Sequence, residues 1–219
     1  MEESEDLMLQ GEAFIDKKDD EQAIMCFKKL LERYPKNFRV WFMMGKSYIT
    51  LENYDEAMVC LEKACSIDPN HLNACLELGN VYRIIKEPLK SIKQINKAVT
   101  IKDKDEHMWF KLGCAYNDLN QYGEAVGCLK KAVELNPKMK KAWYNLGIIH
   151  GDYLGDAVWA IQYYEKLLAI DDARSLLNAY ALLKLHKEYN TIGDTKKANE
   201  CLFKGDSMLN AILMKKMQV

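Results

Sequence analysis

The chain has 219 residues, of which 49% are hydrophobic and 29% are charged, so it is long enough and apolar enough to bury a sizeable core. Its 31 basic and 32 acidic side chains give a net charge of −1, which argues against a nucleic-acid binder because such proteins usually carry a basic excess. The composition also excludes a disordered chain, which would be poor in apolar residues.

The cellular context is predicted from the first residues and from the cysteines. Residues 2–6 are mostly acidic where a secretory signal would be basic, and no apolar run approaches the roughly 20 residues of a membrane helix. The seven cysteines are odd in number and contain no CxxC pair. We therefore expect a cytoplasmic protein with free thiols, without membrane insertion, metal or cofactor.

A repeat of 34 residues runs along the chain from about residue 4. Its clearest marks are glycines that stand 34 residues apart, at Gly11, Gly45, Gly79, Gly113 and Gly147. Large residues flank them in a fixed order, as in Trp41-x2-Met44-Gly45-x2-Tyr48 and Trp109-x2-Leu112-Gly113-x2-Tyr116. A second segment of small and apolar residues follows each glycine, as in Ala57-x3-Leu61-x2-Ala64.

Each repeat reads as two helices, because the apolar residues of both segments recur at helical spacing. Polar breakers separate the two segments, and Pro35, Pro69 and Pro137 close three of the repeats. In chain order the predicted repeats are 4–37, 38–71, 72–105, 106–139 and 140–174, followed by a degenerate sixth repeat within 175–219.

Three details of this pattern make local predictions. The glycine of the first helix should face the alanine of the second helix, so that the two axes approach closely. The fifth repeat contains one extra residue near Tyr153, and the sixth places His186 where the glycine belongs. Apolar residues then continue at helical spacing, which predicts one long final helix over about 195–216.

The Trp–Leu–Gly–Tyr and Ala–Phe–Ala–Pro series resembles the tetratricopeptide repeat family. The resemblance implies an all-α fold, a right-handed superhelical solenoid of antiparallel helix pairs. It also implies a non-catalytic adaptor that binds an extended peptide of a partner protein in a concave groove, through repeat positions 2, 5, 9 and 12. The groove residues so implied are Arg39, Phe42, Lys46, Asn73, Leu76, Asn80, Arg83, His107, Phe110, Asn117, Lys141 and Tyr144.

The chemistry of these positions suggests a partner with acidic and apolar residues. None of them is acidic in repeats 2 to 5, and position 5 is always large and apolar, whereas the asparagines suit the backbone amides of a peptide. The alternative is that position 5 packs between neighbouring first helices. Repeat 1 weakens the charge bias, since its equivalent positions include Glu5 and Glu12.

Enzymatic chemistry finds no support in the sequence. The four histidines are far apart, and the pair His71 and Cys75 is too small a set for zinc. Four cysteines recur at position 23 and are better interpreted as small buried residues than as nucleophiles. Cys114 differs, because it falls among the groove positions.

The end of the chain offers an alternative function. Met208, Leu209, Ile212, Leu213 and Met217 give the final helix an apolar surface. They either pack back on the fifth repeat or form a self-association surface, in which case the protein is a structural scaffold that oligomerises through this helix.

Overall fold

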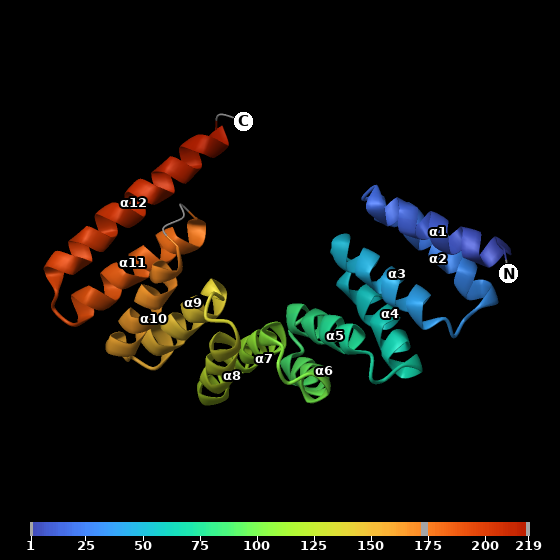
Figure 1. Cartoon of the computed structure of the whole chain (residues 1–219), viewed down its shortest axis with the longest axis horizontal. Coiled ribbons are helices and arrows are strands. Elements are labelled where there is room, and N and C mark those ends of the chain that lie inside the picture. Colours follow the sequence, from blue (N-terminus) through green and yellow to red (C-terminus); the bar gives the residue numbers. More distant parts are fainter. Residues whose placement is uncertain (1, 172–174, 218–219) are drawn as a thin grey trace. The chain divides into compact units, whose positions relative to one another are not determined.

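The structure is a computed structural model that describes residues 2–171 and 175–217, and these residues form α-helical pairs without any strand. The chain divides into two compact units, Met1–Lys104 and Asp105–Val219, each of three helix pairs (Figure 1). The helices of the first unit are α1 (Glu2–Asp16), α2 (Asp20–Arg33), α3 (Phe38–Thr50), α4 (Tyr54–Ile67), α5 (Leu72–Ile84) and α6 (Pro88–Ile101). Those of the second are α7 (Glu106–Asp118), α8 (Tyr122–Leu135), α9 (Lys140–Ile148), α10 (Ala157–Ile170), α11 (Leu176–Thr191) and α12 (Thr195–Met217), with a π-helical turn η1 (Ile149–Tyr153) directly after α9.

The turn inside each pair follows from one recurring backbone conformation. Lys18, Glu52, Lys86 and Asn120 stand 34 residues apart, and all have φ near +60°. The next member of the series is Gly155, which follows after 35 residues, and Gly193 occupies the same place in the sixth repeat. A left-handed residue reverses the chain tightly after a helix, so the four breaker segments act as turns as predicted.

The first helices begin at side-chain caps where the sequence supplies them. The side chain of Asn37 accepts a hydrogen bond from the Val40 amide, and Asp105 and Ser175 cap α7 and α11 in the same way. The Trp41 and Trp143 indoles donate to the carbonyls of Pro35 and Pro137 at 2.8 Å. The tryptophan thus fixes the end of the preceding repeat to the start of its own.

The glycine contact includes one residue more than predicted. A Cβ atom on Gly45 would lie 2.9 Å from Leu61 Cγ, and one on Gly113 would lie 2.8 Å from Leu129 Cγ. Each of these glycines therefore faces the large residue at position 24, and Gly113 also faces the predicted alanine at position 20, since its Cβ would lie 3.2 Å from the Ala125 carbonyl oxygen. The reason is packing, because a buried leucine side chain fills the space that a glycine leaves between the two helices.

The extra residue of the fifth repeat is confirmed by the π-helical turn η1. A π-helical turn holds one residue more than an α-helical turn, so the insertion is absorbed at the end of the first helix and the second helix keeps its register. In the sixth repeat His186 replaces the glycine, and its Nδ1 atom lies 3.0 Å from the Ala198 carbonyl oxygen of α12. A glycine at this position would allow the two helices to approach closely. The His186 side chain instead lies between them and contacts the backbone of α12.

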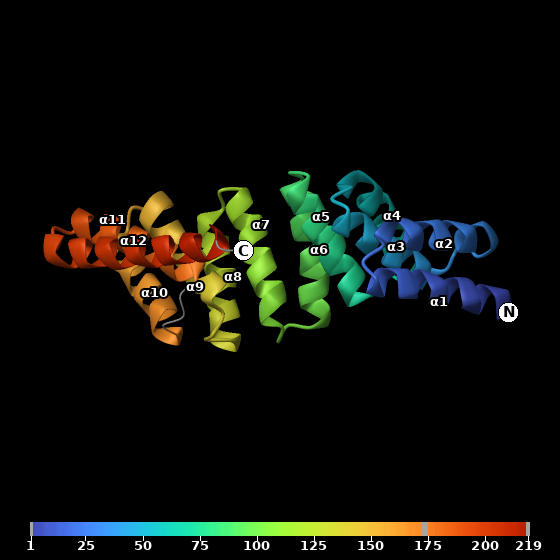
Figure 2. The ribbon, with the colours of Figure 1, turned by 90° about the horizontal axis from the view of Figure 1, so that it is seen from above.

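The long final helix is also confirmed, since α12 runs from Thr195 to Met217 alongside α11 (Figures 1 and 2). Two positions of α12 differ from all other second helices. Repeat positions 21 and 28 are apolar in repeats 1 to 5, for example Ile161 and Leu168, which belong to the apolar cluster that includes Leu185 of α11. In α12 these positions are the exposed polar residues Asn199 and Asp206.

Candidate functional site

The predicted groove residues fall in both units, seven in the first and five in the second. We call the surface formed by the first helices of a unit its first-helix face: α1, α3 and α5 in the first unit, and α7, α9 and α11 in the second. The four large residues at position 5 are all half-buried there, so none is sealed from solvent. They are Phe42, Leu76, Phe110 and Tyr144.

In the first unit, Phe42 belongs to a small aromatic cluster. Its ring stacks on Phe38 with centroids 5.9 Å apart, and the His71 ring lies 4.3 Å from Phe38 and 5.4 Å from Phe42. The ammonium group of Lys46 lies 5.9 Å from the Phe42 ring centroid. Sequence reasoning missed Phe38 and His71, because they lie at positions 1 and 34, where two consecutive repeats meet.

His71 also has a structural task. Its Nδ1 atom accepts a hydrogen bond from the Ala74 amide at 3.2 Å, so the ring caps the N-terminus of α5. This explains why the imidazole is fixed beside the two phenylalanine rings. Within the described residues no group of three or more possible metal ligands occurs, and His71 with Cys75 makes none.

Arg39 does not present an unbalanced charge. Its guanidinium lies 2.5 Å from the Glu12 carboxylate, and its side chain is 67% exposed. Glu12, one of the two acidic residues of repeat 1 at the groove positions, is thus paired with the basic residue at position 2 of repeat 2. The other predicted groove residues of the first unit lie on α5. Asn73 near its start is exposed, and Asn80 and Arg83 further along the helix are half-buried.

In the second unit, three predicted residues line one pocket of about 660 Å³, which we call the lysine pocket. Phe110, Met139 and Leu177 supply apolar surface, and Lys111, Lys138 and Lys141 supply positive charge. The other lining residues are His107, Asn136, Lys140, Asp171 and Ser175. The pocket lies where α7, the segment between α8 and α9, and the beginning of α11 meet.

The lysines of this pocket differ in their pairing. Lys140 is 16% exposed and lies 2.7 Å from Asp171, which neutralises it. Lys111, Lys138 and Lys141 have no acidic partner among the described residues. The pocket therefore carries a net positive charge beside an apolar surface. The run Lys138-Met-Lys-Lys in the sequence could have indicated this positive charge. It was not used, because only Lys141 of the run falls at a groove position.

Tyr144 and Asn117 lie outside the lysine pocket. The Tyr144 ring packs at a tilt on Tyr164, with centroids 5.8 Å apart, and its burial raises the pKa of its phenol. The Asn117 side-chain oxygen is buried and accepts no hydrogen bond from the described residues. Cys114 accepts a hydrogen bond from the Asn145 side chain at 3.4 Å, so its thiol takes part in the contact between α7 and α9.

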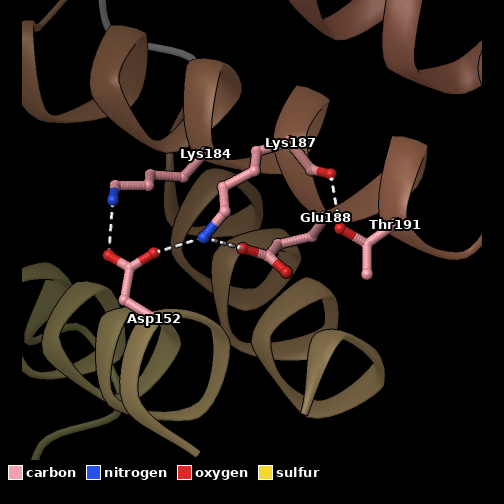
Figure 3. A network of polar contacts seen from close by, with 5 residues as sticks. All are labelled: Asp152, Lys184, Lys187, Glu188 and Thr191. Carbon is pink, nitrogen blue, oxygen red and sulfur yellow. Dashed lines mark hydrogen bonds and ion pairs between the residues drawn. The ribbon is translucent and has the colours of Figure 1, made fainter. Parts of the chain in front are cut away.

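A network of charged residues that the sequence analysis did not name connects η1 to α11 (Figure 3). Asp152 lies between Lys184 at 2.5 Å and Lys187 at 2.6 Å, and Lys187 also lies 3.5 Å from the Glu188 carboxylate. Glu188 is only 2% exposed, and its side chain occupies the space beside Gly151. The sequence did not reveal this network, because the sixth repeat is shifted in phase and the π-helical turn reorients Asp152.

The cysteines are suited to packing rather than to catalysis. Cys26, Cys60 and Cys128 recur at position 23 and are buried, as predicted, whereas Cys201 is half-buried. Burial raises the pKa of the Cys60 thiol to about 12 and that of Cys128 to about 11. These thiols are therefore protonated at neutral pH, and a protonated thiol is a poor nucleophile.

Three family models match the chain. Models described as tetratricopeptide repeats match residues 7–37 and 38–71, and a model described as a TPR repeat matches residues 113–152. With the helix pairs described above, these matches place the chain in the tetratricopeptide repeat family, an all-α solenoid fold. As a member of this family it is a protein-interaction adaptor. No helix of the described chain is long and apolar enough to span a membrane.

Solved structures with the same fold include MamA, PilW and YrrB. A crystal structure of MamA is 25% identical, covers 80% of this chain and 98% of its own, and has a TM-score of 0.71. PilW, a type IV pilus biogenesis factor, is 21% identical over 96% and 98% of the two chains, with a TM-score of 0.75. YrrB, described as having an unusual peptide-binding site, is 21% identical over 80% and 89%, with a TM-score of 0.71. No curated protein sequence matches the chain.

Proposed function

We propose that the protein is a non-catalytic adaptor that binds an extended peptide segment of a partner protein on its first-helix face. The lysine pocket carries this proposal, because it combines apolar surface from Phe110, Met139 and Leu177 with three lysines that have no acidic partner in the described part of the chain. A volume of about 660 Å³ lies in the range of pockets that take ligands, roughly 300 to 1,000 Å³.

The chemistry of the pocket selects the partner segment. Leucine-like side chains would be buried against the three apolar residues, and carboxylates would approach the ammonium groups of Lys111, Lys138 and Lys141. In the first unit, Phe42 and Lys46 offer the same combination on a smaller scale. Asn73 and Asn80 are the residues that would hydrogen-bond a peptide backbone, whereas the buried side-chain oxygen of Asn117 leaves only its amide nitrogen for this role.

A direct binding measurement tests this proposal. The probe is a fluorescein-labelled peptide of alternating glutamate and leucine, and its counterpart contains lysine in place of glutamate. We expect fluorescence anisotropy to show binding of the acidic peptide, which an excess of the unlabelled lysine peptide should not displace. The triple change Lys111→Glu, Lys138→Glu and Lys141→Glu should weaken that binding at least about tenfold, since each reversal replaces attraction by repulsion in the pocket.

The matched control reverses three exposed lysines on second helices of the first unit, none of which lines the pocket: Lys29, Lys63 and Lys93. It changes the net charge by the same amount and should leave binding of the acidic peptide unchanged. If both triple variants lost the same affinity for the acidic peptide, the pocket would not be the binding site. The loss would then come from the change in total charge.

We propose as a second candidate that the protein assembles with itself through the apolar end of α12. The observation in favour is the exposure of Leu213 and Met214, whose side chains are 49% and 67% exposed. Exposed apolar side chains that are adjacent on one helix are typical of an interaction surface.

A further inference from the structure

A second groove lies in the first unit on the side of the second helices, and we call it the outer groove. It runs between α2 and α4, has α3 as its floor, and encloses about 670 Å³. Trp41, Met44 and Tyr48 form the apolar floor, and Val59 of α4 stands at the edge with 49% of its surface exposed. This groove shares no lining residue with the lysine pocket.

The charge of the outer groove is the reverse of that of the lysine pocket. Glu32, Asp55 and Glu56 line it, against one basic residue, Lys28. Asp55 and Glu56 also stabilise the N-terminus of α4, where acidic side chains face the positive end of the helix dipole. An apolar floor with an acidic edge selects an occupant that has apolar side chains and positive charge.

The end of α12 has this chemistry. From Ser207 to Met217 the sequence contains no acidic residue, whereas Lys215 and Lys216 are basic. Leu213 and Met214 are exposed, as is Lys215.

This end of α12 also projects beyond its neighbour. Gly205 of α12 lies against Leu182 and Leu183 of α11, so the antiparallel pairing places α12 residues near 211 beside Leu176, where α11 begins. The remaining residues of α12 extend past that point by roughly 9 Å at the helical rise of 1.5 Å per residue, as Figure 1 shows at the red end of the ribbon.

We propose that the end of α12 of one molecule docks in the outer groove of a second copy of this chain. Leu213 and Met214 lie on the apolar floor, and Lys215 faces the acidic edge formed by Glu32 and Asp55. This is the docking of a helix in a groove, with apolar anchors and flanking charges. The inference rests on the second candidate function, self-assembly through α12, and names the surface that receives the helix.

The geometry of the contact determines the kind of assembly. The two contacting surfaces are different, so each molecule keeps one unused helix end and one unused groove, and further copies add head to tail. The contact involves only the last turns of one helix and is small. Small interfaces belong to weak, transient complexes, so association should rise gradually with protein concentration.

Two single substitutions test the contact on the full chain. Val59→Arg places a bulky positive charge in the groove, and Met214→Glu places a negative charge on the helix end. Both side chains are exposed, so the fold is kept, which circular dichroism verifies. We expect sedimentation velocity to show concentration-dependent association for the unchanged protein and monomers for each variant. The matched controls Val158→Arg and Phe203→Glu change exposed residues of α10 and α12 outside the contact, and they should associate like the unchanged protein.

Mixing the two variants gives the decisive result. The Val59→Arg chain retains its helix end and the Met214→Glu chain retains its groove, so the mixture should form a one-to-one dimer and nothing larger. A monomeric unchanged protein at all concentrations would overturn both self-assembly and this contact. Association of Val59→Arg alone would overturn the outer groove only and leave self-assembly through α12, for example as a symmetric pair of helices.

Discussion

At the scale of single residues, the recurring glycine sets how closely the two helices of a pair approach. In four repeats the residue opposite is an aliphatic or phenylalanine side chain, but in the fifth repeat Gly147 faces Tyr164. A Cβ atom on Gly147 would lie 2.6 Å from Tyr164 Cζ, closer than two carbon atoms can approach. The tyrosine ring is fully buried and rigid, so it has little room to move aside.

We therefore expect Gly147→Ala to lower the free energy of unfolding by about 1–3 kcal/mol, the usual cost of overpacking a core. The matched control is Gly127→Ala, since Gly127 lies inside α8 with nothing within 4 Å of a Cβ atom. That substitution should raise the free energy of unfolding by about 0.5–1 kcal/mol, because alanine favours a helix over glycine. Urea denaturation of both variants checks the pair, and a harmless Gly147→Ala would contradict the close contact.

At the scale of helices and turns, the π-helical turn η1 connects the fifth repeat to the sixth. By accommodating one extra residue it brings Asp152 between Lys184 and Lys187 of α11 (Figure 3). Burial acts to raise the pKa of Asp152, but the hydrogen bonds from the two lysines outweigh it and leave the pKa below its ordinary value of 3.8. The ion pairs therefore stabilise the folded state whenever Asp152 is ionised.

Asp152→Asn tests this connection by removing the charge and keeping the shape. At neutral pH we expect the free energy of unfolding to fall by about 1 kcal/mol, a value reduced by the partial exposure of both lysines. A depressed pKa in the folded state stabilises the protein above the unfolded pKa, and this stabilisation is lost as the pH falls through the folded pKa.

The difference between the two proteins should therefore shrink as the pH falls below the ordinary pKa of 3.8 and through the lower pKa of the folded state. Guanidinium denaturation at neutral and at acidic pH measures it. Asp206→Asn, at an exposed carboxylate of α12, is the control and should cost little at either pH. A difference that stays constant with pH would show that Asp152 acts through its shape and not through its charge.

The sequence predicted the elements better than it predicted the contacts between them. The helix pairs, the extra residue of the fifth repeat and the long final helix follow from a 34-residue spacing that a single chain displays. The prediction for the glycines was incomplete, because the small residues at two positions indicated their close approach but not the large side chain at position 24 that also lies against each glycine. The pairing of Arg39 with Glu12 and of Asp152 with α11 depends on neighbouring repeats, which periodicity does not reveal.

At the scale of the whole molecule, a net charge of −1 conceals local surfaces of opposite sign. The lysine pocket is basic and the outer groove is acidic, and α1 contains six acidic residues and no basic one. Local charge, not the total, therefore governs which segments approach each surface.

This separation predicts how binding responds to salt. The affinity for the glutamate–leucine probe peptide should fall steadily as sodium chloride increases, because the pocket lysines are exposed to screening over about 10 Å at 0.1 M salt. In the triple lysine variant the pocket repels the glutamates, so its weaker binding should strengthen rather than fall as salt screens that repulsion. Anisotropy titrations at several salt concentrations provide the measurement, and an affinity that is independent of salt would indicate that the apolar residues alone hold the peptide.

Asn199 and Asp206 bear on how the array could be lengthened by design. A helix pair added to the flank of α12, in the way that α11 packs on α10, would have to enclose both polar side chains. Removing the Asp206 carboxylate from water costs several kcal/mol unless a cation accompanies it, and an amide without a hydrogen-bond partner costs roughly 1–3 kcal/mol. A designer who wished to append repeats would first exchange these two residues for isoleucine and leucine, the types that α10 uses at Ile161 and Leu168. Two side chains thus decide whether this fold accepts an extension.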